Sequence, residues 1–524
     1  MTTSIVNTQQ LKAIISEENW DQLFELVKPK HFVRQEAGEL PDTAILAQIC
    51  QLLINETSPD TVKILCLKCV GNSCLDIYKY RQHTLGNREP DKYNKYLYNK
   101  LAENNVCQHE EDCGYPHISH FPYDGVIEWT IDYINAHAEY TNCLTANELD
   151  IFRLSIQFLC NLFTYACKNA TFVENENVLR YLNHDNLKQA ITNSIRSDHK
   201  PLVSAACIFV HNALKELQEN YFTDDEKNRL CSQLSKPIKE GFTSAKDALL
   251  HMLHRPNVFE AMYDSMAMSE QLDLLQIIYD ELWQSTSQAV PILTNDTAEF
   301  LALTFCKKSD LILKTVDTYI NSIDPTEVIL ILNILGLLTL KPYKISENAR
   351  PLLINCKYLL MSLHMMGKES NNYFTPITNL SQVAPNVQRR TINVNLTTND
   401  AGVSEETTNH DPQDHPVYGF KSGLIKVIGN MVYRDKMCQD LFREIDGIPL
   451  LLDCCNIDAR NPLILQWAIL ALRNLCEGNL ENQEIIRNCK KEGTVDNTVL
   501  QEMGLTLHED TDGQSIRIAP LRRD

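Results

Sequence analysis

The sequence predicts an all-α fold, a right-handed superhelix of stacked helical repeats, and three observations lead to it. Glycine and proline are scarce, at 17 and 20 of 524 residues, which suits long helices better than a turn-rich β fold. Apolar residues recur at steps of three and four in many segments. Six of these apolar segments carry an asparagine near their C-terminal third, at Asn72, Asn161, Asn212, Asn333, Asn430 and Asn474.

The spacing of these asparagines indicates a repeat length. Asn430 and Asn474 lie 44 residues apart, and Asn161 and Asn212 lie 51 residues apart. An armadillo repeat of two or three helices is about 40–47 residues long. The wider intervals fit two or three repeats, or one repeat with an insertion. We therefore expect an armadillo-like solenoid.

The C-terminal part of the chain shows the expected order of helices most clearly. A short amphipathic segment from Met437 to Ile445 ends at Asp446-Gly447, and a second helix is expected from Ile448 to Cys455. A polar turn then leads into a long apolar segment at 461–478. Short helix, medium helix and long buried helix follow one another in an armadillo repeat.

The long third segment of this repeat has clear start and stop signals. Pro462 suits a first helical turn, and Gly478 suits the left-handed residue that follows a last turn. Apolar side chains occupy nearly all sides between them, so we expect flanking helices to enclose this helix. Trp467 is accordingly expected to be buried.

The residues of this region also carry a family resemblance. The runs FKSGLIKVIGNMVY, GIPLLLDCCNID and NPLILQWAILALRNLCEGNLENQ resemble the C-terminal domain of the ataxin-10 family. ALRNLCEGNLENQ is the most specific part. The resemblance implies a cytoplasmic armadillo-like scaffold that is not an enzyme, with roles in neuron survival, neurite growth, cell division and cilia. It also implies a perinuclear, midbody or cilium-base location.

Composition along the chain predicts the domain organisation. Residues 1–367 are expected to form N-terminal helical repeats, with an inserted loop near 81–120. Residues 368–417 are rich in Asn, Thr, Ser and Pro and poor in apolar residues, which predicts a disordered insertion in a continuous solenoid. Two independent domains remain the alternative. Residues 418–510 are expected to form the C-terminal armadillo domain, and 511–524 a flexible tail.

Net charge and cysteine content limit the classes of partner and the cellular compartment that the sequence favours. The net charge of −20 disfavours general nucleic-acid binding, which requires basic faces. The 18 cysteines, many in apolar runs, favour small buried side chains in a reducing compartment over a disulfide framework. The longest apolar run, Val328 to Leu340, is too short to span a bilayer, and the N-terminus lacks the pattern of a secretory leader. We expect protein partners and no membrane insertion, and homo-oligomerisation stays open.

The candidate protein-binding residues are Asn430, Arg473, Asn474 and Glu477. An asparagine amide both donates and accepts, so one per repeat can hold the backbone of an extended peptide in a groove. The alternative is that each asparagine braces neighbouring helices inside the stack. Arg473 and Glu477 are also spaced to pair on one helix surface.

A nuclear-import adaptor is the alternative function, and a zinc-binding protein is a weaker one. Import receptors of this class carry a tryptophan four residues before the asparagine. This sequence has Lys68, Gln157, Lys426 and Leu470 at those positions, which disfavours recognition of basic signals.

A second cluster has the residue types of a zinc site. Cys107, Cys113, His117 and His120, with His109 between them, are weak metal candidates because their spacings fit zinc poorly. No catalytic motif or phosphate loop is present, so we expect no enzymatic activity and no cofactor.

Overall fold

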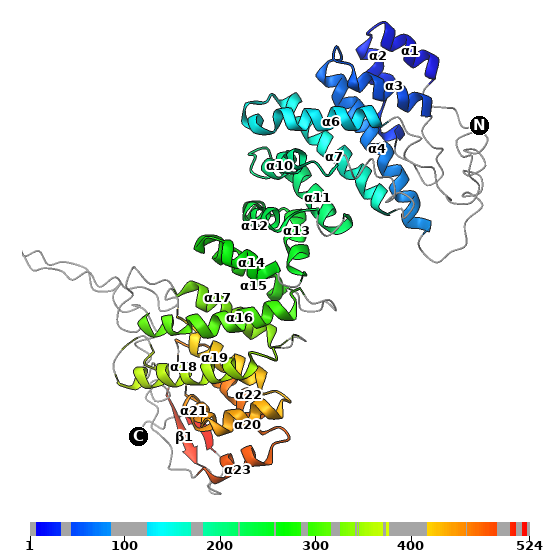
Figure 1. Ribbon diagram of the computed structural model, residues 1–524. Helices are drawn as coiled ribbons and strands as arrows, with labels where there is room; N and C mark the ends of the chain where they lie inside the picture. The colour runs from blue at the N-terminus through cyan, green and yellow to red at the C-terminus, as the bar shows by residue number, and fades with distance from the viewer. Residues whose placement is uncertain are drawn as a thin grey trace, which may run out of the picture. The chain divides into compact units, whose positions relative to one another are not determined.

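A computed structural model describes the architecture (Figure 1). It describes residues 7–32, 43–84, 123–168, 182–217, 221–255, 258–284, 292–315, 325–340, 343, 345–369, 372, 374–376, 417–456, 458, 460–489, 504–509 and 516–520. The chain divides into two compact units, Met1–Met266 and Ala267–Asp524. Within the described residues, all regular elements are helices except one two-stranded sheet. The all-α, armadillo-like prediction is confirmed.

The first unit is a two-layered stack. In one layer α4, α7, α11 and α13 pack each on the next, and in the other α3 packs on α6 and α6 on α10. The short helices α1, α2 and η1 precede this stack. The elements are α1 (Thr8–Ser16), α2 (Trp20–Leu26), η1 (Pro29–Phe32), α3 (Thr43–Ile54), α4 (Asp60–Thr84), α6 (Asp124–His137), η3 (Ala138–Cys143), α7 (Ala146–Lys168), α10 (Asp185–Ser194), α11 (Lys200–Glu216), α12 (Asp224–Lys239), α13 (Thr243–Leu253) and α14 (Val258–Ser265).

The second unit repeats this arrangement. Its α15, α17, α19 and α22 form one layer, and α16, α18 and α20 form the other. We call α4, α7, α11, α13 in the first unit and α15, α17, α19, α22 in the second the ladder helices. The elements are α15 (Met268–Gln284), α16 (Asn295–Lys308), η4 (Ser309–Thr315), α17 (Thr326–Leu338), α18 (Ala349–Glu369), α19 (Phe420–Met431), α20 (Lys436–Glu444), α21 (Gly447–Asp453), α22 (Ile464–Cys476), α23 (Leu480–Asn488), β1 (Leu505–Glu509) and β2 (Ile516–Pro520).

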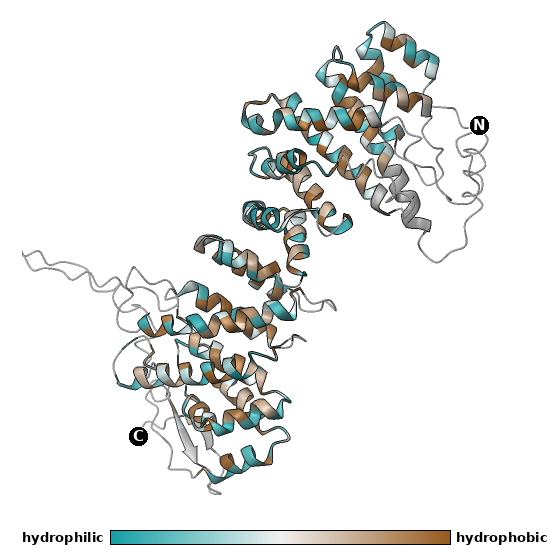
Figure 2. Cartoon of the chain, in the orientation of Figure 1, coloured by the Kyte–Doolittle hydropathy of each residue, from teal (hydrophilic) through white to brown (hydrophobic). Residues whose placement is uncertain are grey.

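Local sequence explains where these helices begin and end. Thr223 and Glu226 form a reciprocal capping box at the start of α12, which satisfies two backbone donors of its first turn. Gly419 precedes α19 with φ of 78°, and Gly478 follows α22 with φ of 70°, both in the left-handed region that glycine occupies without strain. Apolar and hydrophilic residues alternate around the helices, so each helix turns one face to a neighbour (Figure 2).

The second unit is continuous across the predicted insertion. The helix before it, α18, packs on α19 and α20, and α17 packs on α19. Small residues let the ladder helices approach closely: a Cβ added at Gly429 would lie 3.1 Å from the Cβ of Ala471. Both predicted helical parts that flank residues 368–417 therefore contribute to one stack.

A buried polar cluster holds the chain on both sides of this insertion. The Lys421 Nζ donates to the carbonyl of Phe374 at 2.9 Å and lies 3.3 Å from the Asp458 carboxylate. The Arg460 guanidinium donates to the carbonyl of Thr375 at 3.0 Å. The Gly419 N–H donates to the Arg460 carbonyl at 2.9 Å. Residues 374–375, which precede the insertion, are thus held beside the start of α19, which follows it.

The structure differs from the sequence analysis in several details. Helix α22 begins at Ile464 rather than Pro462, because Leu463 adopts a left-handed conformation with φ of 60°. Trp467 is half-buried, and Ile469 is 56% exposed, so the prediction that flanking helices enclose this helix was wrong on one side. The antiparallel pairing of β1 and β2 was not predicted.

Several sequence predictions fall on residues outside the described part of the chain. These include the metal candidates Cys107, Cys113, His117 and His120, the loop near 81–120 and most of residues 368–417. The predicted domain boundaries stay predictions. The cysteines whose side chains the structure describes are free thiols. Among the described residues, no helix is both long and apolar enough to cross a membrane.

Candidate functional site

The asparagines of the ladder helices hold neighbouring helices together. The Asn474 amide of α22 donates to the Gly429 carbonyl of α19 at 2.9 Å. The Asn430 amide of α19 donates to the Gly336 carbonyl of α17 at 3.2 Å. In both pairs the later helix donates to the earlier one. These two asparagines are therefore braces between successive repeats.

The first unit shows the same arrangement. The Asn161 amide of α7 donates to the Gly71 carbonyl of α4 at 3.2 Å, and the Asn212 amide of α11 donates to the Cys160 Sγ of α7 at 3.2 Å. The acceptor residues Gly71, Cys160 and Gly429 each lie directly before an asparagine of the earlier ladder helix. Asn72 donates to Pro29, and Asn333 is exposed. Four of the six asparagines in the sequence pattern therefore join successive ladder helices.

The structure brings the four candidate binding residues together at the C-terminal ends of α19 and α22, but in two groups. Asn474 is only 6% exposed, and its amide is used by the brace, as is that of Asn430. Arg473 and Glu477 are exposed. Glu477 pairs with Arg434 at 3.4 Å rather than with Arg473, because the loop after α19 approaches the end of α22.

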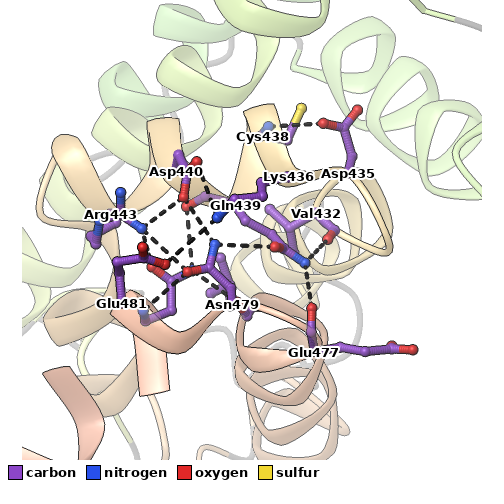
Figure 3. Close-up of polar contacts among 12 residues, drawn as sticks. Val432, Asp435, Lys436, Cys438, Gln439, Asp440, Arg443, Glu477, Asn479 and Glu481 are labelled. Atoms are coloured by element: carbon purple, nitrogen blue, oxygen red, sulfur yellow. Dashed lines mark hydrogen bonds and ion pairs between the residues drawn. The ribbon is translucent and has the colours of Figure 1, made fainter. Parts of the chain in front are cut away.

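A buried polar network follows Asn474 and involves the most specific part of the sequence motif (Figure 3). Gln439 of α20 is 2% exposed, and Asn479 and Asn482 are fully buried. The Asn479 amide donates to Gln439 Oε1 at 3.2 Å and to Asp440 Oδ1 at 2.9 Å. Arg443 donates to the Asp440 carboxylate at 2.7 Å and to Asn482 Oδ1 at 2.9 Å.

This network satisfies the carbonyls at the end of α22. A helix leaves its last four carbonyls without intrahelical partners. The Gln439 amide donates to the carbonyls of Asn474 and Glu477 at 2.9 and 3.2 Å. Asn482 donates to the Leu475 carbonyl at 2.8 Å, and Gln483 donates to the Cys476 carbonyl at 2.8 Å. Asn482 and Gln483 of the GNLENQ run therefore help to terminate α22, and Asn479 holds Gln439 in place for the same role.

The outward side of the ladder helices carries different residues. One turn before the bracing asparagines, the side chains are exposed or half-buried, and they are Lys68, Gln157, Ile208, Lys426 and Leu470. In the second unit we define the ladder face as the outward positions Asn333, Lys426, Gln466, Ile469 and Arg473. Gln466, Ile469 and Arg473 recur at steps of three and four, so they share one side of α22.

Lys426 has an unusual environment on this face. Its Nζ lies 5.4 Å from the centre of the Trp467 ring, and its stem crosses Gly336, where a Cβ would lie 3.4 Å from the lysine Cδ. Burial lowers the pKa of Lys426 from its usual value of 10.5. Within the described residues, Lys426 has no ion pair or hydrogen bond through its ammonium group, and Arg473 has none through its guanidinium.

The described residues include no candidate metal centre. They contain no group of three or more His, Cys, Asp or Glu side chains arranged to hold a metal ion. Burial raises the pKa of the Cys438 and Cys454 thiols to about 12, so both are held as thiols. The arrangement of exposed side chains on stacked helices suits contact with another macromolecule.

Comparison with known proteins identifies the C-terminal part of the chain. Residues 420–518 match the family model described as the spinocerebellar ataxia type 10 protein domain. This range covers α19 to β2, including the Asn430 and Asn474 braces and the polar network. The resemblance to the ataxin-10 family is confirmed.

Curated relatives extend the similarity beyond this domain. Ataxin-10 of Xenopus tropicalis is 32% identical over 268 residues, which cover 49% of this chain and 49% of the relative. Human ataxin-10 is 28% identical over 263 residues, covering 49% of this chain and 50% of the relative. A Dictyostelium discoideum homolog is 44% identical over 87 residues, or 17% and 14% of the two chains. The matches with the vertebrate proteins span about half of their length.

Solved structures give weaker similarity. The protein SYS-1 is 11% identical and the match covers 85% of this chain and 83% of that chain, but the TM-score is 0.25. A likeness at this level carries no conclusion about the fold or the function.

Proposed function

From the ataxin-10 domain at residues 420–518, we propose that this protein is a non-enzymatic scaffold that binds protein partners. The ladder face carries the proposal. Stacked helical repeats form an extended surface suited to protein binding, and this face presents apolar Ile469, polar Gln466 and charged Arg473 without internal partners among the described residues.

The proposed contact residues follow from the brace geometry. Arg473 is exposed without a side-chain partner among the described residues and Glu477 is exposed and paired with Arg434, whereas the amides of Asn430 and Asn474 already donate to internal carbonyls. We therefore assign Arg473 and Glu477 to the binding surface, and Asn430 and Asn474 to its support. Lys68 and Lys426 at the positions before the asparagines would repel basic signals, which argues against an import adaptor.

The cellular setting is part of the same proposal. Through the resemblance to ataxin-10, we infer a cytoplasmic protein that takes part in neurite growth, neuron survival, cell division or ciliary processes. The net charge of −20 supports protein partners rather than nucleic acid.

Proximity labelling with the full chain tests this proposal. Ile469→Ser changes an exposed apolar residue of the ladder face, and Leu480→Ser changes a comparable one on α23, outside the ladder helices. Because both side chains are exposed, both variants should fold like the wild type. We expect Ile469→Ser to lose labelled partners and Leu480→Ser to keep them. Failure of the wild type to label any protein above background would reject the scaffold proposal.

A further inference from the structure

We propose that the partner presents an acidic segment to the ladder face, where its carboxylates bind Lys426 and Arg473. This inference rests on the proposed scaffold function and adds the chemical class of the partner. It depends on the two cations of the face, the residues between them and the charge of the rest of the chain.

The two lysines of α19 differ in the partners of their ammonium groups. Lys421, on the inward side, is 2% exposed and fully satisfied by Asp458 at 3.3 Å and the Phe374 carbonyl at 2.9 Å. Lys426, on the outward side, makes no ion pair or hydrogen bond with the described residues through its ammonium group, which lies 5.4 Å from the centre of the Trp467 ring. A half-buried ammonium has lost part of its hydration, and a ring face replaces only part of that loss. A carboxylate from a partner would complete its environment.

Arg473 provides a second cation on the adjacent ladder helix. It is exposed, and no described carboxylate pairs with it. The nearest acidic residue along α22, Glu477, is paired with Arg434 at 3.4 Å, which partly neutralises it. Asn333, Gln466 and Ile469 complete the face without negative charge. In a chain of net charge −20, the five positions of the ladder face carry two cations and no carboxylate.

The geometry sets the spacing of the acidic residues. Packed helices lie about 8–10 Å apart. Arg473 follows Trp467 by six residues, or roughly 9 Å along α22 at 1.5 Å per residue. The two cations are thus separated by roughly 10–13 Å, which an extended chain covers in about three to four residues. We expect the partner segment to carry acidic residues at this spacing.

A peptide-binding experiment with the full chain tests the inference. The probes are a short fluorescein-labelled peptide with glutamates three or four residues apart, and the same peptide with glutamine at each of these positions. Fluorescence anisotropy should show binding of the acidic peptide that weakens as salt is added, because exposed charges are screened. The glutamine peptide should bind at least about tenfold more weakly.

Substitutions locate this binding on the ladder face. The double variant Lys426→Gln/Arg473→Gln should weaken binding of the acidic peptide by about tenfold or more. The double variant Lys307→Gln/Lys314→Gln removes the same charge from exposed lysines of α16 and η4, and it should bind like the wild type. The charge-preserving Lys426→Arg/Arg473→Lys should retain binding. These comparisons also separate loss of binding from loss of folding.

Three results would overturn the inference. They are equal affinity for the acidic and glutamine peptides, an equal loss in both glutamine double variants, and no binding of the acidic peptide at about 1 mM. If proximity labelling still depends on Ile469 in that case, the scaffold function stands and only the acidic class of partner is rejected. If labelling also fails, both proposals are rejected together.

Discussion

At the scale of single residues, the positions of the ladder asparagines could be found from the sequence, but their structural role could not. Four of the six recurring asparagines join neighbouring ladder helices, and both peptide binding and internal bracing were consistent with the sequence pattern. The choice depends on whether a carbonyl of the preceding repeat lies within reach. Gly429 supplies that carbonyl to Asn474 from 45 residues earlier, and nothing in the local sequence reveals this distance.

The brace predicts a stability effect at Asn474. Asn474→Ala would leave the buried Gly429 carbonyl without a donor, so we expect the free energy of unfolding to fall by about 1–3 kcal/mol. Arg473→Ala, on the exposed neighbour, should change it by less than about 0.5 kcal/mol. Denaturant unfolding of the two variants measures both values. Equal values for the two variants would mean that Asn474 is not a brace.

Trp467 shows a second limit of the sequence. An apolar helix predicts enclosure, but the pattern does not say how many neighbours surround it. Helix α22 packs on α19, α21 and α23, while Gln466 and Ile469 stay exposed. Trp467 therefore lies at the border between the helix interface and the ladder face, where it meets Lys426.

At the scale of elements, the end of α22 depends on side chains from two other helices. Gln439→Met keeps the size and flexibility of the side chain but removes its amide, which donates to three carbonyls. We expect a loss of about 2–3 kcal/mol in the free energy of unfolding. Gln466→Met, on the exposed side of α22, is the matched control and should be nearly neutral. Calorimetric or chemical unfolding of the two variants measures both changes, and equal losses would contradict the role of the Gln439 amide.

Helix α18 has a comparable device at its start. The Glu299 carboxylate of α16 accepts from the backbone N–H groups of Ser346, Glu347 and Asn348, the last two at 3.0 and 2.9 Å. Burial alone would raise the pKa of Glu299, but these N–H groups outweigh it and lower the pKa below the usual 4.5. The carboxylate therefore acts as a cap supplied from another helix.

This cap predicts a pH-dependent stability. Because the folded-state pKa of Glu299 is lowered, its contribution is present above pH 4.5 and is lost as the pH falls through the folded-state value. Glu299→Gln should reduce the free energy of unfolding by about 1–2 kcal/mol near neutral pH. The difference from the wild type should shrink in acid. Glu347→Gln, an exposed control, should show no such dependence, and a constant difference for Glu299→Gln would contradict the cap.

The cap from Glu299 and the carbonyl contacts of Gln439 could not be predicted from the sequence, and the reason is the same for both. Glu299 and Asn348 are 49 residues apart, and Gln439 and Asn479 are 40 apart. Helical periodicity and turn residues report only on neighbours along the chain. The elements themselves were largely predictable, whereas the residues that join them required their arrangement in space.

At the scale of the whole molecule, the sequence predicted stacked repeats and one stack on both sides of residues 368–417. Both are consistent with the packing of α17 and α18 on α19. The division into two compact units at Met266 was not predicted.

The continuity of the second unit predicts the outcome of cutting the chain. A protease site inserted within residues 377–416 should yield two fragments that remain together on a sizing column. The contacts of α18 with α19 and the bonds from Lys421 and Arg460 to residues 374–375 hold them. Fragments that separate without denaturant would instead indicate two independent domains. In the cut protein, Arg460→Ala should lower the denaturant concentration at which they separate.

The polar network at the end of α22 indicates where an additional repeat could be inserted into the stack. Asn161, Asn430 and Asn474 each donate to a carbonyl of the preceding ladder helix, so in these pairs the earlier helix supplies the acceptor and the later helix the donor. At the end of α22, the carbonyls of Asn474, Leu475 and Cys476 accept from the side chains of Gln439, Asn482 and Gln483. A duplicated repeat placed after α22 would compete with these side chains for the end of α22, whereas one placed between α17 and α19 could both receive and offer a brace. Lengthened versions of this protein should therefore be built from within the stack.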